Sequence, residues 1–172
     1  MNFKKFFNFS IFQSSNCNNG QLLIESMIAI SIIVVGLLGL LGLLSRSLSL
    51  NRVVSDQFTA NYLAAEGIEV VKNIVDANTV QKQPWNLGLA NGEFQVSYDS
   101  VQLESTLRQP LVFEEGTGRY SYGFGRPTSF VRTIKIELLS QDEIKVNSIV
   151  NWTTRGGGKF EVNTEDHFFN WR

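Results

Sequence analysis

Apolar residues gather in one long segment near the N-terminus. Residues 27–44 contain no charged side chain, and Ser31 is their single polar one. At about 1.5 Å per helical residue this run covers about 27 Å, close to the roughly 30 Å hydrocarbon core of a bilayer. The pattern predicts a membrane-spanning helix, which we assign to residues 21–44.

The helical pattern continues beyond the apolar run. Its apolar residues recur at spacings near three and four: Leu50, Val53, Val54, Ala60, Ala64, Ile68, Val71 and Val75. This spacing is typical of an amphipathic helix, and no proline interrupts it before Pro84. We expect one helix from about Leu22 to about Asp76, with Arg52 and Asp56 paired one turn apart on its polar face.

The pattern of the C-terminal part predicts β-strands. Apolar and polar residues alternate over 130–138 and over 144–152, and residues 140–143 between them suit a hairpin turn. The glycine-rich residues 155–159 suit a second turn, into a short strand over 160–163. These segments predict a three-stranded antiparallel meander with one apolar face, which the stripe on the helix can cover.

The predicted fold class is α+β, a long N-terminal helix packed on a small antiparallel β-sheet. An earlier strand is expected over 93–100, so the sheet spans about 93–163. Residues 101–127 show no clear pattern. We expect the extracytoplasmic domain to comprise residues 45–172.

Charge is distributed unevenly along a chain whose formal net charge is only −1. Glu25 is the sole charged residue over 22–44. Lys4 and Lys5 precede the apolar run, whereas the first charges behind it cancel: Arg46, Arg52, Asp56 and Glu66. The positive-inside rule then places the N-terminus in the cytoplasm and the C-terminal bulk outside, in a single-pass inner-membrane protein. The near-neutral total gives no large basic field for nucleic acid.

Residue types that carry catalysis are sparse. Cys17 is the lone cysteine and His167 the lone histidine, so no Cys/His cluster for zinc exists, and no glycine-rich phosphate loop follows a strand. His167 stands among aromatic residues and is interpreted as structural. The acidic pairs 114–115 and 142–143 suit solvated turns. We therefore predict no enzyme, no catalytic residue, no cofactor and no metal site.

A short motif stands where the apolar helix begins. It reads Gly20-Gln21-Leu22-Leu23-Ile24-Glu25-Ser26-Met27. It resembles the class III signal of type IV prepilins and pseudopilins, in which a glycine and one variable residue precede an apolar triplet, a glutamate and a hydrophobic helix. The resemblance implies a leader over residues 1–20, cut by prepilin peptidase between Gly20 and Gln21. It also implies methylation of the new N-terminus at Gln21, where the family usually has phenylalanine.

Glu25 becomes the fifth residue of the mature chain under this resemblance. A carboxylate at the edge of an apolar helix is costly and is a functional site by default. The family implies that Glu25 pairs with the N-terminal amine of a neighbouring subunit during filament assembly. The plainer interpretation is that Glu25 extends to the membrane interface. The implied partners are other pilin or pseudopilin subunits, prepilin peptidase, the inner-membrane assembly platform and the membrane.

Three further features extend the resemblance or add to it. Residues 64–69 and the end of the chain over 169–172 are similar to PilV-like and type II secretion I-type minor pilins. Gly36, Gly39 and Gly42 permit close helix packing or local extension of the helix within a filament, and a third interpretation is accident, because membrane helices tolerate glycine well.

Residues 116–126 mix glycine, arginine and aromatic side chains. Such a loop can stack on sugars or on single-stranded DNA, but a hairpin whose aromatics pack on the domain is the preferred interpretation.

A rival class is a single-pass membrane-anchored or secreted extracytoplasmic binding or adhesion protein. An ordinary signal sequence has a shorter apolar region and a small-x-small cleavage site, which residues 43–47 do not provide. Cys17 precedes the apolar run and cannot act as a lipoprotein acceptor behind it. The motif therefore favours the filament subunit.

Overall fold

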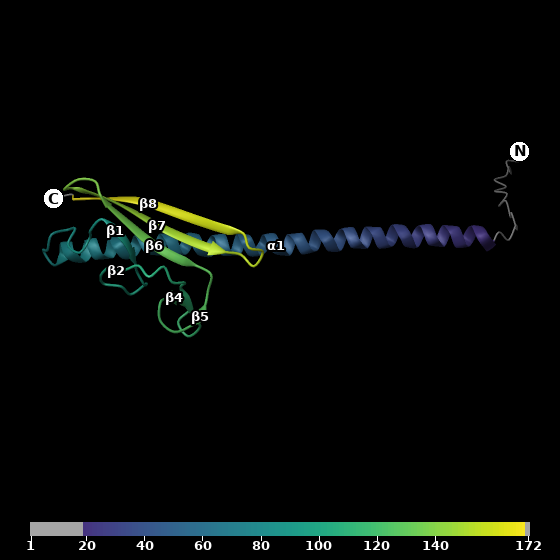
Figure 1. The fold of residues 1–172 in the computed structure, drawn as a ribbon, viewed down its shortest axis with the longest axis horizontal. Helices are drawn as coiled ribbons and strands as arrows, with labels where there is room; N and C mark the ends of the chain where they lie inside the picture. Colours follow the sequence, from purple (N-terminus) through teal and green to yellow (C-terminus); the bar gives the residue numbers. More distant parts are fainter. Residues whose placement is uncertain (1–18, 171–172) are drawn as a thin grey trace, which may run out of the picture. The chain divides into compact units, whose positions relative to one another are not determined.

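A computed structural model describes residues 19–170 of the chain (Figure 1). Most of the predicted leader, with Lys4, Lys5 and Cys17, lies outside these residues, as do Trp171 and Arg172. The chain divides into two units, residues 1–48 and residues 49–172. The described part has one helix and eight strands, and the helix packs against antiparallel sheet, so the α+β prediction is confirmed.

The helix, α1, runs without a break over Asn19–Val80. It begins before the predicted Leu22 and ends after the predicted Asp76. Leu50 and Asp76 both lie well inside it, so the prediction of a single continuous helix through the apolar and amphipathic halves is confirmed.

The C-terminal end of α1 is closed by a specific cap. The N–H of Gln83 donates to the carbonyl of Asn78 at 2.9 Å, and the N–H of Lys82 donates to that of Thr79 at 3.2 Å. Lys82 adopts the left-handed conformation with φ 58°, and Pro84 cannot continue a helix. This Schellman arrangement ends the helix at Val80, a few residues beyond the apolar stripe from which the helix was predicted.

The larger sheet has five strands in the order β2-β1-β6-β7-β8, and every neighbouring pair is antiparallel. The strands are β1 Gly92–Gln95, β2 Glu104–Ser105, β6 Val131–Leu138, β7 Glu143–Thr153 and β8 Lys159–Phe169. The predicted meander is confirmed as β6-β7-β8, and the earlier strand exists as the shorter β1. Figure 1 shows the long strands β6 to β8 lying along the C-terminal half of α1.

β8 is much longer than the predicted 160–163. It pairs with β7 along its whole length, from Lys159 opposite Thr153 to Phe169 opposite Glu143. The alternation is hard to recognise in the sequence, because polar residues such as Thr164 occupy positions on the face that also carries the apolar Val162 and Phe168. Backbone pairing along an edge strand does not require the apolar side chains by which a strand is recognised in sequence.

A second, three-stranded sheet arises from the stretch that showed no pattern. Its order is β4-β3-β5, with β3 Val112–Glu114, β4 Arg119–Ser121 and β5 Arg126–Pro127. Strands of two or three residues are too short for alternation to be legible. Gly125 is required here, because a Cβ atom would lie 2.5 Å from the carbonyl oxygen of Phe113.

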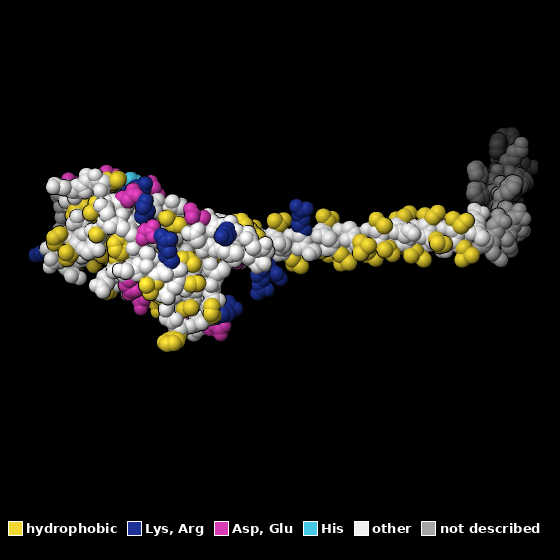
Figure 2. Space-filling view, in the orientation of Figure 1, with side chains coloured by type: hydrophobic (Ala, Val, Ile, Leu, Met, Phe, Trp, Pro, Cys, Tyr) yellow, Lys and Arg dark blue, Asp and Glu magenta, His cyan; other side chains and the backbone are white. Residues whose placement is uncertain are grey.

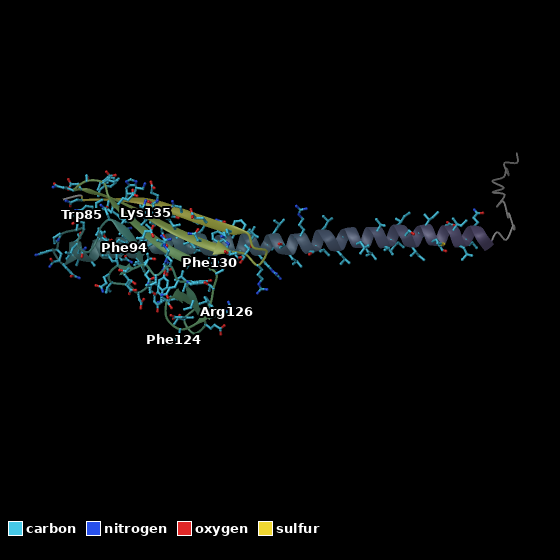
Figure 3. All side chains as sticks on the ribbon, in the orientation of Figure 1. Trp85, Phe94, Phe124, Arg126, Phe130 and Lys135 are labelled. Carbon is cyan, nitrogen blue, oxygen red and sulfur yellow. The ribbon has the colours of Figure 1, made fainter. Side chains whose placement is uncertain are left out.

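The core lies between α1 and the larger sheet. The helix buries Ala60, Leu63, Ala64, Ile68, Val70, Val71 and Ile74, and the sheet side buries Val96, Phe130, Ile134, Ile136, Ile144, Val146, Val150 and Trp152. On β7 every second residue from Ile144 to Trp152 is buried, as the alternation predicts, and Asn147 is buried in addition. Figure 3 labels Phe130 beside the helix.

The first part of the predicted stripe is wrong. Leu50 and Val54 are 59% and 51% exposed, although the later members Ala60, Ala64 and Val71 are buried. The buried face is formed by residues such as Leu63, which lie on a different side of the helix from Leu50. Arg52 and Asp56 form no ion pair within 4 Å among the described residues, so that pairing prediction is also wrong.

Candidate functional site

The first turns of α1 carry every residue that the prepilin resemblance singles out. Gly20, Gln21 and Glu25 are all helical and exposed. Gln21 and Glu25 lie one turn apart and line one shallow groove together with Ile28 and Ile32. The helical repeat thus places the proposed new N-terminus and the carboxylate on one face.

Glu25 has no partner within the described chain. No hydrogen bond or ion pair joins its carboxylate to another described residue, and its neighbours in the groove, Ile24, Ile28 and Ile32, are apolar. A carboxylate in such surroundings needs water or a cation from outside the chain.

Gly20 lies inside the helix, not before it. A Cβ atom at this position would meet nothing within 4 Å, so the chain imposes no close contact there. Gly20 is exposed in the first turn of α1, so the expected cleavage position is accessible.

The serine hydroxyls in the apolar half of α1 are satisfied by hydrogen bonds within the helix. The hydroxyl of Ser26 donates to the carbonyl of Leu23 at 2.8 Å, and that of Ser31 donates to Met27 at 2.7 Å. Such internal bonds suit a lipid environment, where no water replaces them. α1 is long and apolar enough to cross a membrane once, and Figure 2 shows hydrophobic side chains along both edges of this part of the helix.

Gly36, Gly39 and Gly42 leave the helix unbroken. A Cβ atom at any of them would meet nothing within 4 Å. No contact among the described residues requires glycine at these positions.

A second apolar stripe on α1 faces away from the core. Leu50, Val54, Phe58 and Tyr62 recur every four residues, and Phe58 and Tyr62 are 61% and 75% exposed. We call these four residues the outer stripe. The outer stripe was not predicted, because Leu50 and Val54 were assigned to the buried face. The four-residue spacing that connects them to Phe58 and Tyr62 was the signal in the sequence that could have revealed it.

Glu66 and Gly67 sit where α1 meets the sheet. The buried guanidinium of Arg132, from β6, contacts the Glu66 carboxylate at 2.7 Å and donates to the carbonyls of Leu63 and Val96 at 3.0 and 2.6 Å. A Cβ atom on Gly67 would clash with Ser148 and with Ile134. The 64–69 segment is thus explained by helix–sheet packing. Arg132 is in phase with Phe130, Ile134 and Ile136, so the alternation of β6 was the signal that could have placed it on the buried face.

The glycine-rich loop over 116–126 is largely engaged with the domain. Tyr120 packs edge-on to Phe113 at 5.1 Å, and the Tyr122 hydroxyl donates to the carbonyl of Arg132 at 3.3 Å. Burial raises the pKa of Tyr122. Phe124 is the exception, with 99% of its surface exposed at the tip that Figure 3 labels. The preferred hairpin interpretation holds for the tyrosines but not for Phe124.

His167 belongs to a polar cluster on β7 and β8. Its Nδ1 lies 2.8 Å from the Glu143 carboxylate and its Nε2 lies 3.5 Å from Glu165. The hydrogen bond to Glu143 raises the pKa of His167. Glu165 accepts hydrogen bonds from Asn147 and then Lys145, which lower its pKa to about 2. These groups form one interstrand network on the solvent face of the sheet.

Over residues 19–170 no group of three or more His, Cys, Asp or Glu side chains is arranged to hold a metal ion.

No family model matches the chain, and no curated protein or solved structure shows significant similarity to it.

Proposed function

We propose that this chain is a pilin-like subunit, cut between Gly20 and Gln21, anchored by the first half of α1, and assembled into a filament of the type IV pilus or type II secretion kind. Prepilin peptidase, the inner-membrane assembly platform and other pilin-like subunits are its proposed partners. Methylation at Gln21 follows cleavage in this scheme.

One observation carries the proposal. Glu25, the only charge over 22–44, stands at a fixed distance from Gly20 in the prepilin pattern and has no partner in the described chain. The amine created at Gln21 supplies the missing cation when it belongs to a neighbouring subunit. A subunit that leaves this carboxylate unpaired in hydrocarbon is disfavoured, so pairing selects for correct axial register.

Two surfaces support assembly independently of the motif. The outer stripe exposes four large apolar side chains at helical spacing, and Gly36, Gly39 and Gly42 leave room on the apolar segment. Exposed apolar rows on a helix are typical of surfaces that another helix covers. A monomeric membrane-anchored binding protein, the rival class, has no need of them.

The test compares two substitutions at Glu25. Glu25→Gln keeps the size of the side chain and removes its charge, and Glu25→Ala removes both. Both variants should be cleaved and inserted normally, because neither step uses the carboxylate. Both should be depleted at least tenfold from sheared filaments, since a lost buried ion pair of about 1.4 kcal/mol or more has that effect.

Glu69→Gln is the matched control, because Glu69 is exposed on the same helix far from the motif. It should assemble like the wild type. Wild-type amounts of Glu25→Gln and Glu25→Ala in purified filaments would refute the pairing.

A further inference from the structure

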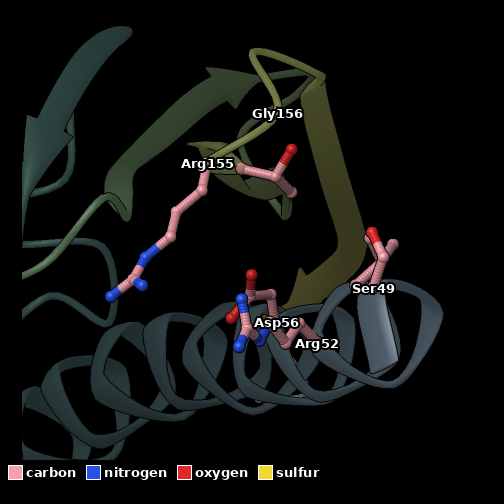
Figure 4. Close-up of a pocket in the computed structure, with 7 residues that line it drawn as sticks. Ser49, Arg52, Asp56, Arg155 and Gly156 are labelled. Atoms are coloured by element: carbon pink, nitrogen blue, oxygen red, sulfur yellow. The ribbon is translucent and has the colours of Figure 1, made fainter. Parts of the chain in front are cut away.

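A cleft lies between α1 and the turn that joins β7 to β8. It has a volume of about 410 Å³ and is lined by Ser49, Arg52, Val53, Asp56, Thr154, Arg155 and Gly156. Figure 4 shows Arg155 reaching down from the turn while Arg52 and Asp56 rise together from the helix. Two segments far apart in sequence therefore bring two guanidinium groups to one cleft.

The two arginines of this cleft are not paired with a carboxylate of the described residues. Neither Arg52 nor Arg155 forms an ion pair within 4 Å in the described chain. The hydrogen bonds of the turn run between Thr154, Gly157 and Gly158, so they leave the N–H groups of Arg155 and Gly156 unused. Asp56 balances one of the two positive charges, and the cleft keeps a net positive charge.

This donor set suits a singly charged phosphate group. Arginine forms paired hydrogen bonds with phosphate oxygens, and backbone N–H groups in a glycine-rich turn add further donors. The hydroxyl of Ser49 lines the same space, as does that of Thr154, which donates to the carbonyl of Gly158 at 3.3 Å. A doubly charged anion would meet the Asp56 carboxylate with less compensation, which favours a phosphodiester.

The position of the cleft in the chain indicates the source of that phosphodiester. Ser49 follows the apolar run, which ends at Leu44, after only residues 45–48. Arg52 follows Leu44 by eight residues, so the chain itself keeps Arg52 near the end of the apolar run. Headgroups begin directly beyond the hydrocarbon core, and a long arginine side chain is suited to reach them.

We propose that Arg52 and Arg155 bind the phosphodiester of an anionic phospholipid headgroup, so that the membrane-proximal end of the domain is a lipid-headgroup site. The proposal rests on the membrane anchoring in the proposed function but not on cleavage or filament assembly. Such a site would hold this end of the domain at the membrane surface.

The test uses the full chain reconstituted in nanodiscs of equal phosphatidylcholine and phosphatidylglycerol. After transfer to mild detergent, native mass spectrometry counts the lipids that remain bound. The wild type should retain phosphatidylglycerol over phosphatidylcholine. Each arginine removed should lower that ratio about fivefold, the equivalent of about 1 kcal/mol per charge near an anionic surface.

The informative variant is Arg52→Gln/Arg155→Gln, in which both changed side chains are exposed and lie outside the core. Lys72→Gln/Lys82→Gln removes the same charge from exposed positions toward the other end of the domain helix and should leave the ratio unchanged. Equal ratios in the wild type and the arginine variant would overturn the site. An equal loss in both double variants would show only a general charge effect and would overturn it as well.

A second arm separates lipid from free phosphate. Nanodiscs of pure phosphatidylcholine receive millimolar inorganic phosphate or glycerol phosphate, and neither should remain bound. Retention of these ions at the level of phosphatidylglycerol would overturn the lipid assignment. Incorporation into the disc is scored separately, because a chain that fails to incorporate contradicts the anchoring itself and with it the proposed function.

Discussion

Arg132 is the most consequential single residue of the folded domain. Its side chain is fully buried, and its charge is balanced by Glu66, whose side chain is 32% exposed. Two carbonyl groups, of Leu63 and Val96, accept its remaining strong hydrogen bonds. The guanidinium thereby ties α1, the end of β1 and β6 together, and its desolvation is tolerable only while the carboxylate remains.

Glu66→Ala should therefore destabilise the domain by roughly 3 kcal/mol, because it leaves a buried cation uncompensated. Glu69→Ala, an exposed glutamate on the same helix, should change the free energy of unfolding by less than about 0.5 kcal/mol. Urea unfolding of the full chain in micelles, followed by far-ultraviolet circular dichroism, measures both. Equal effects of the two substitutions would contradict the role given to the pair.

His167 gives the domain a pH dependence near neutrality. Its pKa is raised above the ordinary 6.5, chiefly by its hydrogen bond to Glu143 and secondarily by Glu165. A raised pKa in the folded state stabilises the fold fully below pH 6.5, and that contribution is lost as pH rises through the raised value. Unfolding midpoints of the wild type should fall over this window, and those of His167→Gln should not. A parallel fall in both would show that another group titrates.

At the scale of elements, the contact between α1 and the sheet depends on a missing side chain. Gly67 is buried, and an added Cβ would lie 2.8 Å from the Ile134 side chain and still closer to Ser148. Alanine is the better helix former, so helix propensity alone predicts that Gly67→Ala raises the free energy of unfolding by about 1 kcal/mol. We expect the steric clash at the helix–sheet contact to outweigh this gain.

Gly67→Ala should accordingly lower the free energy of unfolding by about 1–3 kcal/mol. Gly116→Ala serves as its control, because a Cβ there meets nothing within 4 Å. Thermal unfolding of both variants decides the sign. A Gly67→Ala protein more stable than the wild type would show that the sheet shifts to accommodate the methyl group.

The elements also show what could be predicted from the sequence and what could not. β7 could be predicted because every second residue from Ile144 to Trp152 is buried, although Asn147 between them is buried as well. β6 was legible despite Arg132, since one buried charge does not disturb the period of its neighbours. β3, β4 and β5 were not legible, because pairing of very short strands depends on contacts distant in sequence.

The helix was predicted well in extent and poorly in orientation. Apolar residues at spacings of three and four define a face only when a single stripe exists, and α1 has two. Leu50 and Val54 belong to the outer stripe with Phe58 and Tyr62, so they were placed on the wrong face. The candidate site itself was readable because Gly20, Gln21 and Glu25 lie in one short local motif.

At the scale of the whole molecule, several features lack a counterpart inside the described chain. The Glu25 carboxylate is unpaired, the outer stripe is uncovered, and Gly36, Gly39 and Gly42 have open space beside them. The residues that join α1 to the larger sheet, by contrast, are buried within the domain. These features of the helix are the ones on which the proposed assembly rests.

The most direct measurement is the N-terminal sequence of the protein extracted from membranes of cells that also make a prepilin peptidase. We predict a mature chain that starts at Gln21, because Gly20 precedes the cut in the prepilin pattern. A Gly20→Glu variant should insert but keep Met1, whereas Gly116→Glu should be processed normally. A wild-type chain that starts at Met1, or beyond Leu44, would contradict the assignment as a pilin-like subunit.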